Sequence, residues 1–143
     1  MKIHTHQILA MMLLMMISLA QTACDGNEPD PAADALKQLT GSWQVSQVKV
    51  DGMDRTDLFD DFSLVIAQKQ FTATNGEPVW PASGTWAFAD DQGTTFTRDD
   101  GVVVKIESLS NTSLVLSLMW TKTTLGAGRE RSVSGAHVFE FRK

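Results

Sequence analysis

The sequence contains few of the residues on which catalytic and metal centres are built. It has a single cysteine, so no disulfide can form within the chain. Two of its three histidines, His4 and His6, lie close to the first residue. The remaining one, His137, has no second histidine and no Gly-x-Ser-x-Gly motif to work with, so we expect a structural role. We therefore expect no catalytic activity, no metal site and no cofactor.

The chain also lacks an excess of basic residues. Its formal net charge is −5 at pH 7, and its lysines and arginines do not gather into a patch. We therefore expect no binding of nucleic acid and no docking on anionic lipid through the protein surface itself. The acidic residues do cluster, as Asp51, Asp54, Asp57, Asp60 and Asp61. Their spacing does not match a calcium-binding EF-hand loop, and solvation of a surface loop explains them; a Ca²⁺ site is the alternative.

The longest apolar run is too short to cross a membrane. It extends from Ile8 to Ala20, about thirteen residues, whereas a transmembrane helix needs roughly 20. It follows Lys2, and a short apolar run after a basic residue is typical of a secretory signal peptide. We predict that residues 1–23 are a signal peptide that is removed.

This run is followed by small residues and the cysteine, in the order Thr22-Ala23-Cys24. The order resembles the lipobox of bacterial lipoproteins. The resemblance implies that the thiol of Cys24 carries diacylglycerol with palmitate-type chains, which anchor the new N-terminus in a membrane. The expected location is the envelope of a Gram-negative bacterium, with the outer membrane expected and neither face favoured, although Asp25 resembles the residue that favours inner-membrane retention in enteric bacteria. The alternative is an incidental thiol after an ordinary cleavage site.

Residues 24–38 are expected to be the acylated cysteine and a tether ahead of one domain at 39–143. The segment from Asp25 to Pro31 is polar and contains two prolines, which favours an extended, unpacked chain. One or two helical turns are expected over residues 34–39. The remaining length is sufficient for a single hydrophobic core.

From residue 43 onward, short apolar segments alternate with turn residues. This pattern predicts antiparallel strands, at residues 43–50, 64–67, 71–74, 84–89, 94–98, 102–107, 114–120 and about 132–142. In the first strand the alternation changes parity, which predicts a β-bulge near Ser46 and Gln47. The predicted fold class is all-β, an eight-stranded antiparallel up-and-down meander closed as a barrel.

The connections between the predicted strands differ in length. Long connections, at residues 51–62, 75–83 and 121–130, alternate with tight turns, and the turn at 99–101 is the short connection on the long-loop side. In a meander, alternate connections lie at opposite ends. One end of the barrel is therefore predicted to be closed and the other to carry loops, where binding sites usually lie.

Three segments carry a family resemblance. They are Gly41-Ser42-Trp43 at the start of the first strand, Gly84-Thr85-Trp86 at the start of the fourth, and Phe139-Glu140-Phe141-Arg142 at the end of the last. Together they resemble the lipocalin-like domain of small Gram-negative lipoproteins over residues 39–143. The resemblance implies a lipocalin-like barrel in which Arg142 packs across the ring of Trp43 at the closed end, a cation–π contact of about 0.5–2 kcal/mol. It also implies a small apolar ligand inside the barrel.

A set of large apolar side chains is expected to line or fill the barrel. The candidate ligand-binding residues are Phe71, Trp80, Trp86, Phe88, Leu116, Leu118, Trp120 and Phe139. Trp80 lies in a loop flanked by Pro78 and Pro81, either as a lid or partner hot spot or as an anchor under the rim. The predicted function is non-catalytic binding of a small apolar ligand. Because eight strands enclose room for packed side chains or one small ligand, the alternative is a filled core whose loops bind an envelope protein or glycan.

Overall fold

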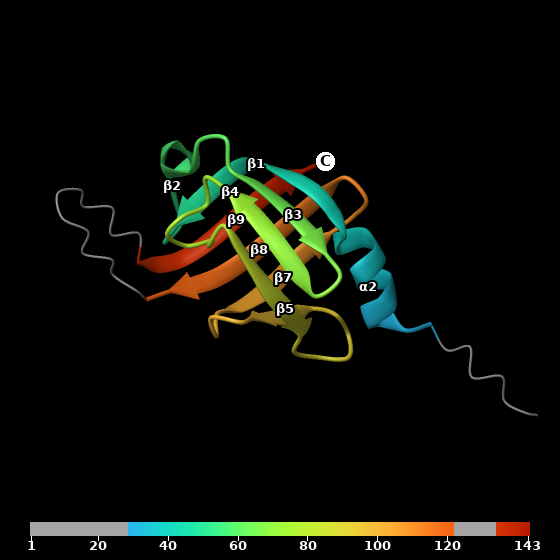
Figure 1. Cartoon of the computed structure of the whole chain (residues 1–143). Helices are drawn as coiled ribbons and strands as arrows, with labels where there is room; N and C mark the ends of the chain where they lie inside the picture. The colour runs from blue at the N-terminus through green and yellow to red at the C-terminus, as the bar shows by residue number, and fades with distance from the viewer. Residues whose placement is uncertain (1–28, 122–133) are drawn as a thin grey trace, which may run out of the picture.

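The structure is a computed structural model that describes residues 29–121 and 134–143 (Figure 1). Its elements in chain order are α2 (Pro31–Leu39), β1 (Gly41–Val50), β2 (Met53–Asp54), the 3-10 helix η1 (Thr56–Phe59), β3 (Ser63–Ala67), β4 (Gln70–Thr74), β5 (Ser83–Phe88), β6 (Thr95–Arg98), β7 (Val103–Leu109), β8 (Ser113–Trp120) and β9 (Gly135–Arg142). Within the described ranges, neither helix has the length and apolar character needed to cross a membrane. The predicted signal peptide, Cys24 and most of the predicted loop 121–130 lie outside them.

The strands form one antiparallel sheet that closes into a barrel. Strands β3 to β9 follow one another in sequence order, and β1 pairs with β3 on one side and with β9 on the other. The two-residue strand β2 adds a short extension opposite Lys49 and Val50 of β1. The barrel proper therefore consists of eight strands joined edge to edge. The predicted all-β, eight-stranded antiparallel barrel is confirmed.

The first strand bends as its sequence pattern predicts. The register between β1 and β9 shifts between Val45 and Gln47, which confirms the predicted bulge. The extra residue lets Trp43 on one side of the bulge, and Val48 and Val50 on the other, face the interior. A second register shift, between β7 and β8, was not predicted from the sequence.

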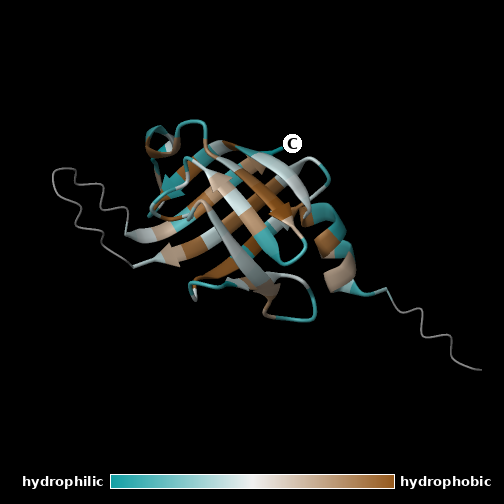
Figure 2. Ribbon diagram, viewed as in Figure 1, coloured by the Kyte–Doolittle hydropathy of each residue, from teal (hydrophilic) through white to brown (hydrophobic). Residues whose placement is uncertain are grey.

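Side chains from all the barrel strands meet in one core. Figure 2 shows hydrophobic residues along the strands and hydrophilic ones mainly in the connecting turns. On β8, Leu114, Leu116, Leu118 and Trp120 are at most 5% exposed, whereas Met119 is 59% exposed. This alternation gives each strand one face toward the core. The largest of the fully buried side chains are Trp43, Trp80, Arg98, Phe59, Phe62, Phe96, Phe139 and Phe141.

The two ends of the barrel differ, as expected for this order of connections. We call one the closed end: it carries the turns after β3, β5 and β7, and α2 lies beside it (Figure 1). We call the other the looped end: it carries residues 51–62, 75–82 and 99–102 and the start of β9. The 51–62 connection contains the 3-10 helix η1.

Helix α2 is fixed to the closed end by its sequence. The side chain of Asp30 accepts hydrogen bonds from the N–H groups of Ala32 and Ala33 and so caps the helix N-terminus. Ala35 packs against Gly93 in the turn between β5 and β6, where a Cβ would lie 2.7 Å from Ala35 and where φ is +66°. Glycine at this position allows both the turn and the close approach of the helix.

Candidate functional site

The candidate residues for ligand binding face the interior, but they do not form one site. Phe88 is half-buried, and the others are buried: Phe71, Trp80, Trp86, Leu116, Leu118, Trp120 and Phe139. Trp86 and Phe88 pack together toward the closed end, where the indole N–H of Trp86 donates to the carbonyls of Ala67 and Gln70, at 3.1 and 3.2 Å.

Trp80 fills the looped end from a loop rather than from a strand. It lies between β4 and β5 and is 1% exposed. Its ring centroid lies 6.3 Å from that of Phe62, 5.6 Å from Phe71 and 6.1 Å from Phe139. Its backbone N–H donates to the carbonyl of Gly76 at 2.8 Å, and a Cβ on Gly76 would lie 2.7 Å from Phe62 and Trp80. Of the two sequence-based alternatives for Trp80, the structure shows the anchor under the rim.

A buried arginine holds this loop against the barrel. The guanidinium carbon of Arg98 lies 4.7 Å from the centroid of the Trp80 ring, and Nη1 donates to the carbonyl of Val79 at 2.9 Å. Nε and Nη2 donate to the two carboxylate oxygens of Asp100, whose side chain is 25% exposed. These contacts compensate a charge that would otherwise be costly to bury. Arg98 was not among the residues predicted from the sequence, although its spacing of two from Phe96 in β6 places it on the same, inward face.

The acidic connection 51–62 also fills the looped end. Phe59 and Phe62 are almost completely buried, and their ring centroids lie 5.3 and 5.7 Å from that of Phe139 in edge-on arrangements. Neither phenylalanine was predicted from the sequence to be in the core, because the surrounding aspartates indicated a solvated loop. Together with Trp80, these two phenylalanines occupy the looped half of the interior.

His137 lies in the same aromatic cluster. Its ring stacks on Phe139, with centroids 5.7 Å apart, and meets the edge of Phe59. Nδ1 lies 3.0 Å from the carbonyl of Gly135, which can only accept, so Nδ1 carries the proton. Burial lowers the pKa of His137, against smaller opposing effects of the Gly135 hydrogen bond and the Asp51 charge. The imidazole of His137 is therefore neutral at pH 7. Its buried Nε2 is an acceptor with no hydrogen-bond partner among the described residues.

The indole N–H groups distinguish the two ends of the barrel. At the closed end, Trp43 donates to the carbonyl of Leu39 at 2.8 Å, and Trp86 is bonded as described above. At the looped end, Nε1 of Trp80 is buried with no hydrogen-bond partner in the described ranges. Buried indoles normally find a partner, so Trp80 is packed by its ring and not fixed through its N–H.

The closed end has the expected tryptophan but a different cation. The ammonium of Lys143 lies 4.3 Å from the centroid of the Trp43 ring and donates to the carbonyls of Gln38 and Thr40, at 3.1 and 3.0 Å. Arg142, the expected partner of Trp43, is exposed on the outer face of β9. The prediction was one residue off, because Arg142 follows the inward-facing Phe141 and alternation turns it outward.

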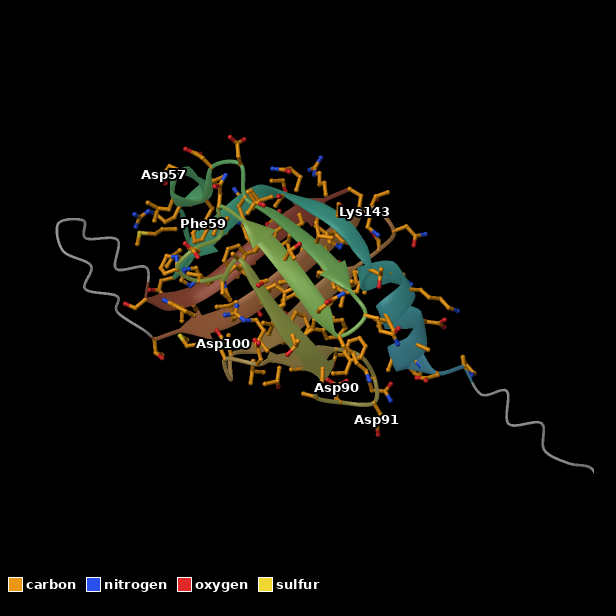
Figure 3. All side chains as sticks on the ribbon, in the orientation of Figure 1. Asp57, Phe59, Asp90, Asp91, Asp100 and Lys143 are labelled. Atoms are coloured by element: carbon orange, nitrogen blue, oxygen red, sulfur yellow. The ribbon has the colours of Figure 1, made fainter. Side chains whose placement is uncertain are left out.

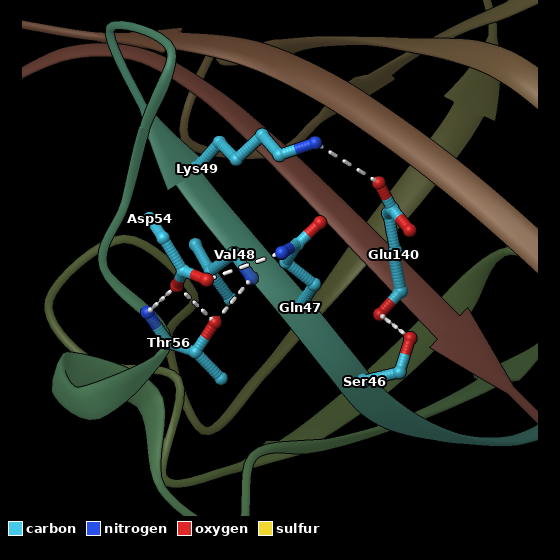
Figure 4. A network of polar contacts seen from close by, with 7 residues as sticks. All are labelled: Ser46, Gln47, Val48, Lys49, Asp54, Thr56 and Glu140. Carbon is cyan, nitrogen blue, oxygen red and sulfur yellow. Dashed lines mark hydrogen bonds and ion pairs between the residues drawn. The ribbon is translucent and has the colours of Figure 1, made fainter.

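The aspartates of the 51–62 connection support local structure. Asp54 accepts hydrogen bonds from the hydroxyl and backbone N–H of Thr56 and from the amide of Gln47, at 2.7, 3.0 and 3.1 Å (Figure 4). These bonds, above all that from the Thr56 hydroxyl, lower the pKa of Asp54. Thr56 in turn accepts from the backbone N–H of Val48 at 3.0 Å. Across residues 29–121 and 134–143, no group of three or more His, Cys, Asp or Glu side chains could hold a metal ion.

Exposed carboxylates surround the looped end. We call them the acidic rim: Asp51, Asp54, Asp57, Asp60, Asp61, Glu77, Asp99 and Asp100. Figure 3 shows Asp57 and Asp100 on this side of the molecule. Among the described residues, the basic side chains at this end are Lys49 near the end of β1, Arg55, which is half-buried beside Asp57, and the buried Arg98. The described part of the looped end therefore carries an excess of negative charge.

Apolar side chains are exposed beside this rim. Met53 on β2, Val103 on β7 and Met119 on β8 are each more than half exposed. A shallow hollow of about 330 Å³ lies on the outer face of β7–β9, between Val103, Met119 and Val138. The looped end thus presents apolar side chains within a negatively charged surface.

No protein-family model, curated protein or solved structure matches this chain. By its fold, the protein is a closed eight-stranded antiparallel β-barrel with an aromatic core. Its resemblance to the lipocalin-like domains of bacterial lipoproteins stays a prediction from the three sequence segments.

Proposed function

We propose that this protein is a lipid-anchored lipoprotein of the bacterial cell envelope, with a lipocalin-like barrel that binds a protein partner through the outside of its looped end, without catalysis. The order Thr22-Ala23-Cys24 supports the anchor. The packing of Trp80, Phe59 and Phe62 into the looped half of the core is the observation that favours outside binding. A ligand entering from this end would first have to displace these buried rings, and each ring buries a large apolar area.

The surface chemistry of the looped end suggests the kind of partner. Met53, Val103 and Met119 offer exposed apolar contacts, and methionine adapts its shape to a partner. The acidic rim around them complements a basic surface, which raises the rate of association at low salt. The proposed partner therefore carries an apolar contact patch surrounded by lysine and arginine.

Photo-crosslinking of the full-length protein to its partner in intact cells tests this proposal. A photoreactive residue is placed at Met53 or Met119 in the full-length chain, and the matched control carries it at Val65, an exposed apolar position on the side of the barrel. We expect one discrete crosslinked protein from Met53 and Met119, weakened by added salt, and none from Val65. The same products from all three positions, or none from the looped end, would contradict a binding surface there.

The anchor has its own test. Cys24→Ser removes the acylated thiol, so the full-length protein should leave the membrane fraction. A variant that stays in this fraction would show that the lipoprotein proposal is wrong. Mass analysis of the N-terminal peptide from the unaltered protein provides the direct control, because the acyl chains add a known mass to Cys24.

Binding of a small apolar ligand inside the barrel is the second candidate function. It is favoured by the way Trp80 is held: this side chain comes from a loop, and its Nε1 is buried without a hydrogen-bond partner among the described residues. The buried Nε2 of His137 likewise has no hydrogen-bond partner among them. A ligand that replaced the Trp80 ring would leave the strands intact. Native mass spectrometry after incubation with a cell lipid extract should then show a discrete adduct, which Leu116→Trp would abolish by filling the interior. A clean ligand-free mass, under conditions in which a control lipid carrier keeps its ligand, would exclude this candidate.

A further inference from the structure

We infer that the closed end of the barrel faces the membrane and that the looped end points away from it. This inference rests on the proposed acylation of Cys24 and adds the orientation that the anchor imposes.

The chain enters the barrel at the closed end. Pro31 and Ala35 of α2 line a hollow together with Gly93 and Thr94 in the turn after β5. The C-terminus of the helix is held as firmly, because Lys143 donates to carbonyls at that point. Figure 1 shows α2 at one end of the barrel and η1 with β2 at the other. The point at which the tether leaves the folded domain is therefore fixed at the closed end.

The chain between the anchor and the helix is short. Residues 25–30 separate Cys24 from α2, which allows a span of at most about 25 Å when fully extended. An unstrained flexible chain of this length averages only about 15 Å. The barrel measures about 20 Å along its axis for strands such as β8 tilted by about 40°, before the loops are added. The tether would have to be almost fully extended to bring the looped end to the lipid surface.

The charge distribution favours the same orientation. In the described part of the looped end, the eight carboxylates of the acidic rim outnumber Lys49, Arg55 and Arg98, and anionic lipid headgroups would repel this excess of negative charge. The closed end carries both signs: exposed Lys37, Lys69, Arg142 and Lys143 offset the aspartates of α2 and of the turn after β5. Figure 3 shows Asp90 and Asp91 of that turn on the opposite side of the molecule from Asp57. The closed end can therefore approach a lipid surface without the repulsion that the rim would meet, and the rim stays accessible to a partner.

Fluorescence quenching on liposomes tests this orientation. Because Cys24 is the only cysteine and is acylated in the proposal, a cysteine introduced elsewhere is the only free thiol. Full-length acylated protein carries one fluorophore at Gln92→Cys or Asn111→Cys at the closed end, or at Asp57→Cys or Asp99→Cys at the looped end. All four positions are exposed. The liposomes contain lipid with a nitroxide quencher on the headgroup.

We expect the two closed-end labels to lose fluorescence and the two looped-end labels to keep it. Equal quenching at both ends, or stronger quenching at Asp57 and Asp99, would overturn the orientation. A protein whose Cys24 peptide carries no acyl mass and that does not float with liposomes would overturn the proposed anchor itself, and with it the orientation. These two failures are distinguished because the first occurs on acylated, liposome-bound protein.

A longer tether tests the cause. Insertion of about 20 Gly and Ser residues before Pro31 raises the average span to about 28 Å, enough for either end to reach the lipid. The difference between closed-end and looped-end labels should then shrink. A difference that is unchanged would show that the short tether does not set the orientation. Cys24→Ser with Asn111→Cys is the matched control, with neither binding nor quenching expected.

Discussion

The closed end and the looped end differ in whether their buried polar atoms are hydrogen-bonded. At the closed end, the indole N–H groups that enter the core have partners, because Trp43 and Trp86 each donate to backbone carbonyls. At the looped end, Trp80 Nε1 and His137 Nε2 are buried without hydrogen-bond partners among the described residues. An unsatisfied buried polar atom costs about 1–3 kcal/mol, so the looped end is expected to contribute less net stability.

The two ends also differ in the surroundings of the cationic side chain that packs on a tryptophan ring. Lys143 keeps its ammonium at the surface, over the ring of Trp43, where water can still solvate it. Arg98 is buried among aromatic rings and depends on Asp100 for its countercharge. We therefore expect the closed end to contribute more to the stability of the fold. At the looped end, the loops are held in place by the ion pair between Arg98 and Asp100, which is lost when either side chain is replaced.

The largest expected effect comes from breaking the buried ion pair at the looped end. Asp100→Ala leaves the guanidinium of Arg98 buried without its carboxylate and should lower the free energy of unfolding by about 3–5 kcal/mol. Arg98→Met should cost less, because the partly exposed carboxylate of Asp100 can be solvated by water. Lys143→Met at the closed end should cost only about 0.5–2 kcal/mol. Chemical denaturation of the three variants provides the measurement.

A double variant checks the reason for this order. If the unpaired guanidinium causes the loss in Asp100→Ala, then combining it with Arg98→Met should restore part of the stability. A double variant that is less stable than Asp100→Ala by the full cost of Arg98→Met would show that the two side chains act independently.

A smaller effect should separate the tryptophans of the two ends. Trp43→Phe leaves the buried carbonyl of Leu39 without its indole donor, which adds about 1–3 kcal/mol to the loss of packing. Trp80→Phe removes an N–H that has no hydrogen-bond partner in the described structure, so its cost should come from packing alone. Unfolding free energies of the two variants give the comparison. Equal losses would mean that Trp80 Nε1 is bonded in solution, for instance to a buried water.

The sequence was sufficient to predict the barrel because its strands alternate clearly. Leu114, Leu116, Leu118 and Trp120 repeat with a period of two, and the change of parity in β1 predicts the bulge that the structure shows. Turn residues separate the strands, and a meander of eight short strands closes naturally. These features are local, and local patterns can be recognised in a single sequence.

The contents of the looped end depend on contacts between distant residues. Phe59 and Phe62 lie among aspartates, so their neighbours in the sequence do not reveal that they meet Phe139. The alternation of β6 places Arg98 on the inward face. Its charge can be buried there only because Asp100 and the carbonyl of Val79, from another loop, accept its hydrogen bonds. Lys143 was missed because strand alternation says nothing about the residue that follows the last strand.

The smallest expected effect concerns His137 and pH. Burial lowers the pKa of His137 in the folded protein below the value of about 6.5 expected in the unfolded chain. Between these two values the unfolded state binds the proton more readily. The stability contributed by His137 is therefore complete above about pH 6.5 and is lost as the pH falls from there through the folded pKa.

His137→Phe provides the matched variant, because phenylalanine keeps the stack on Phe139 but cannot titrate. Unfolding free energies measured between about pH 7.5 and 5 should fall in the original protein and stay nearly constant in the variant. Asp54, Asp90 and Glu107 have lowered pKa values, so their contribution is lost at lower pH, below about 4.5, in both proteins alike. Equal slopes above pH 5 would show that His137 is already solvated or charged in the folded state.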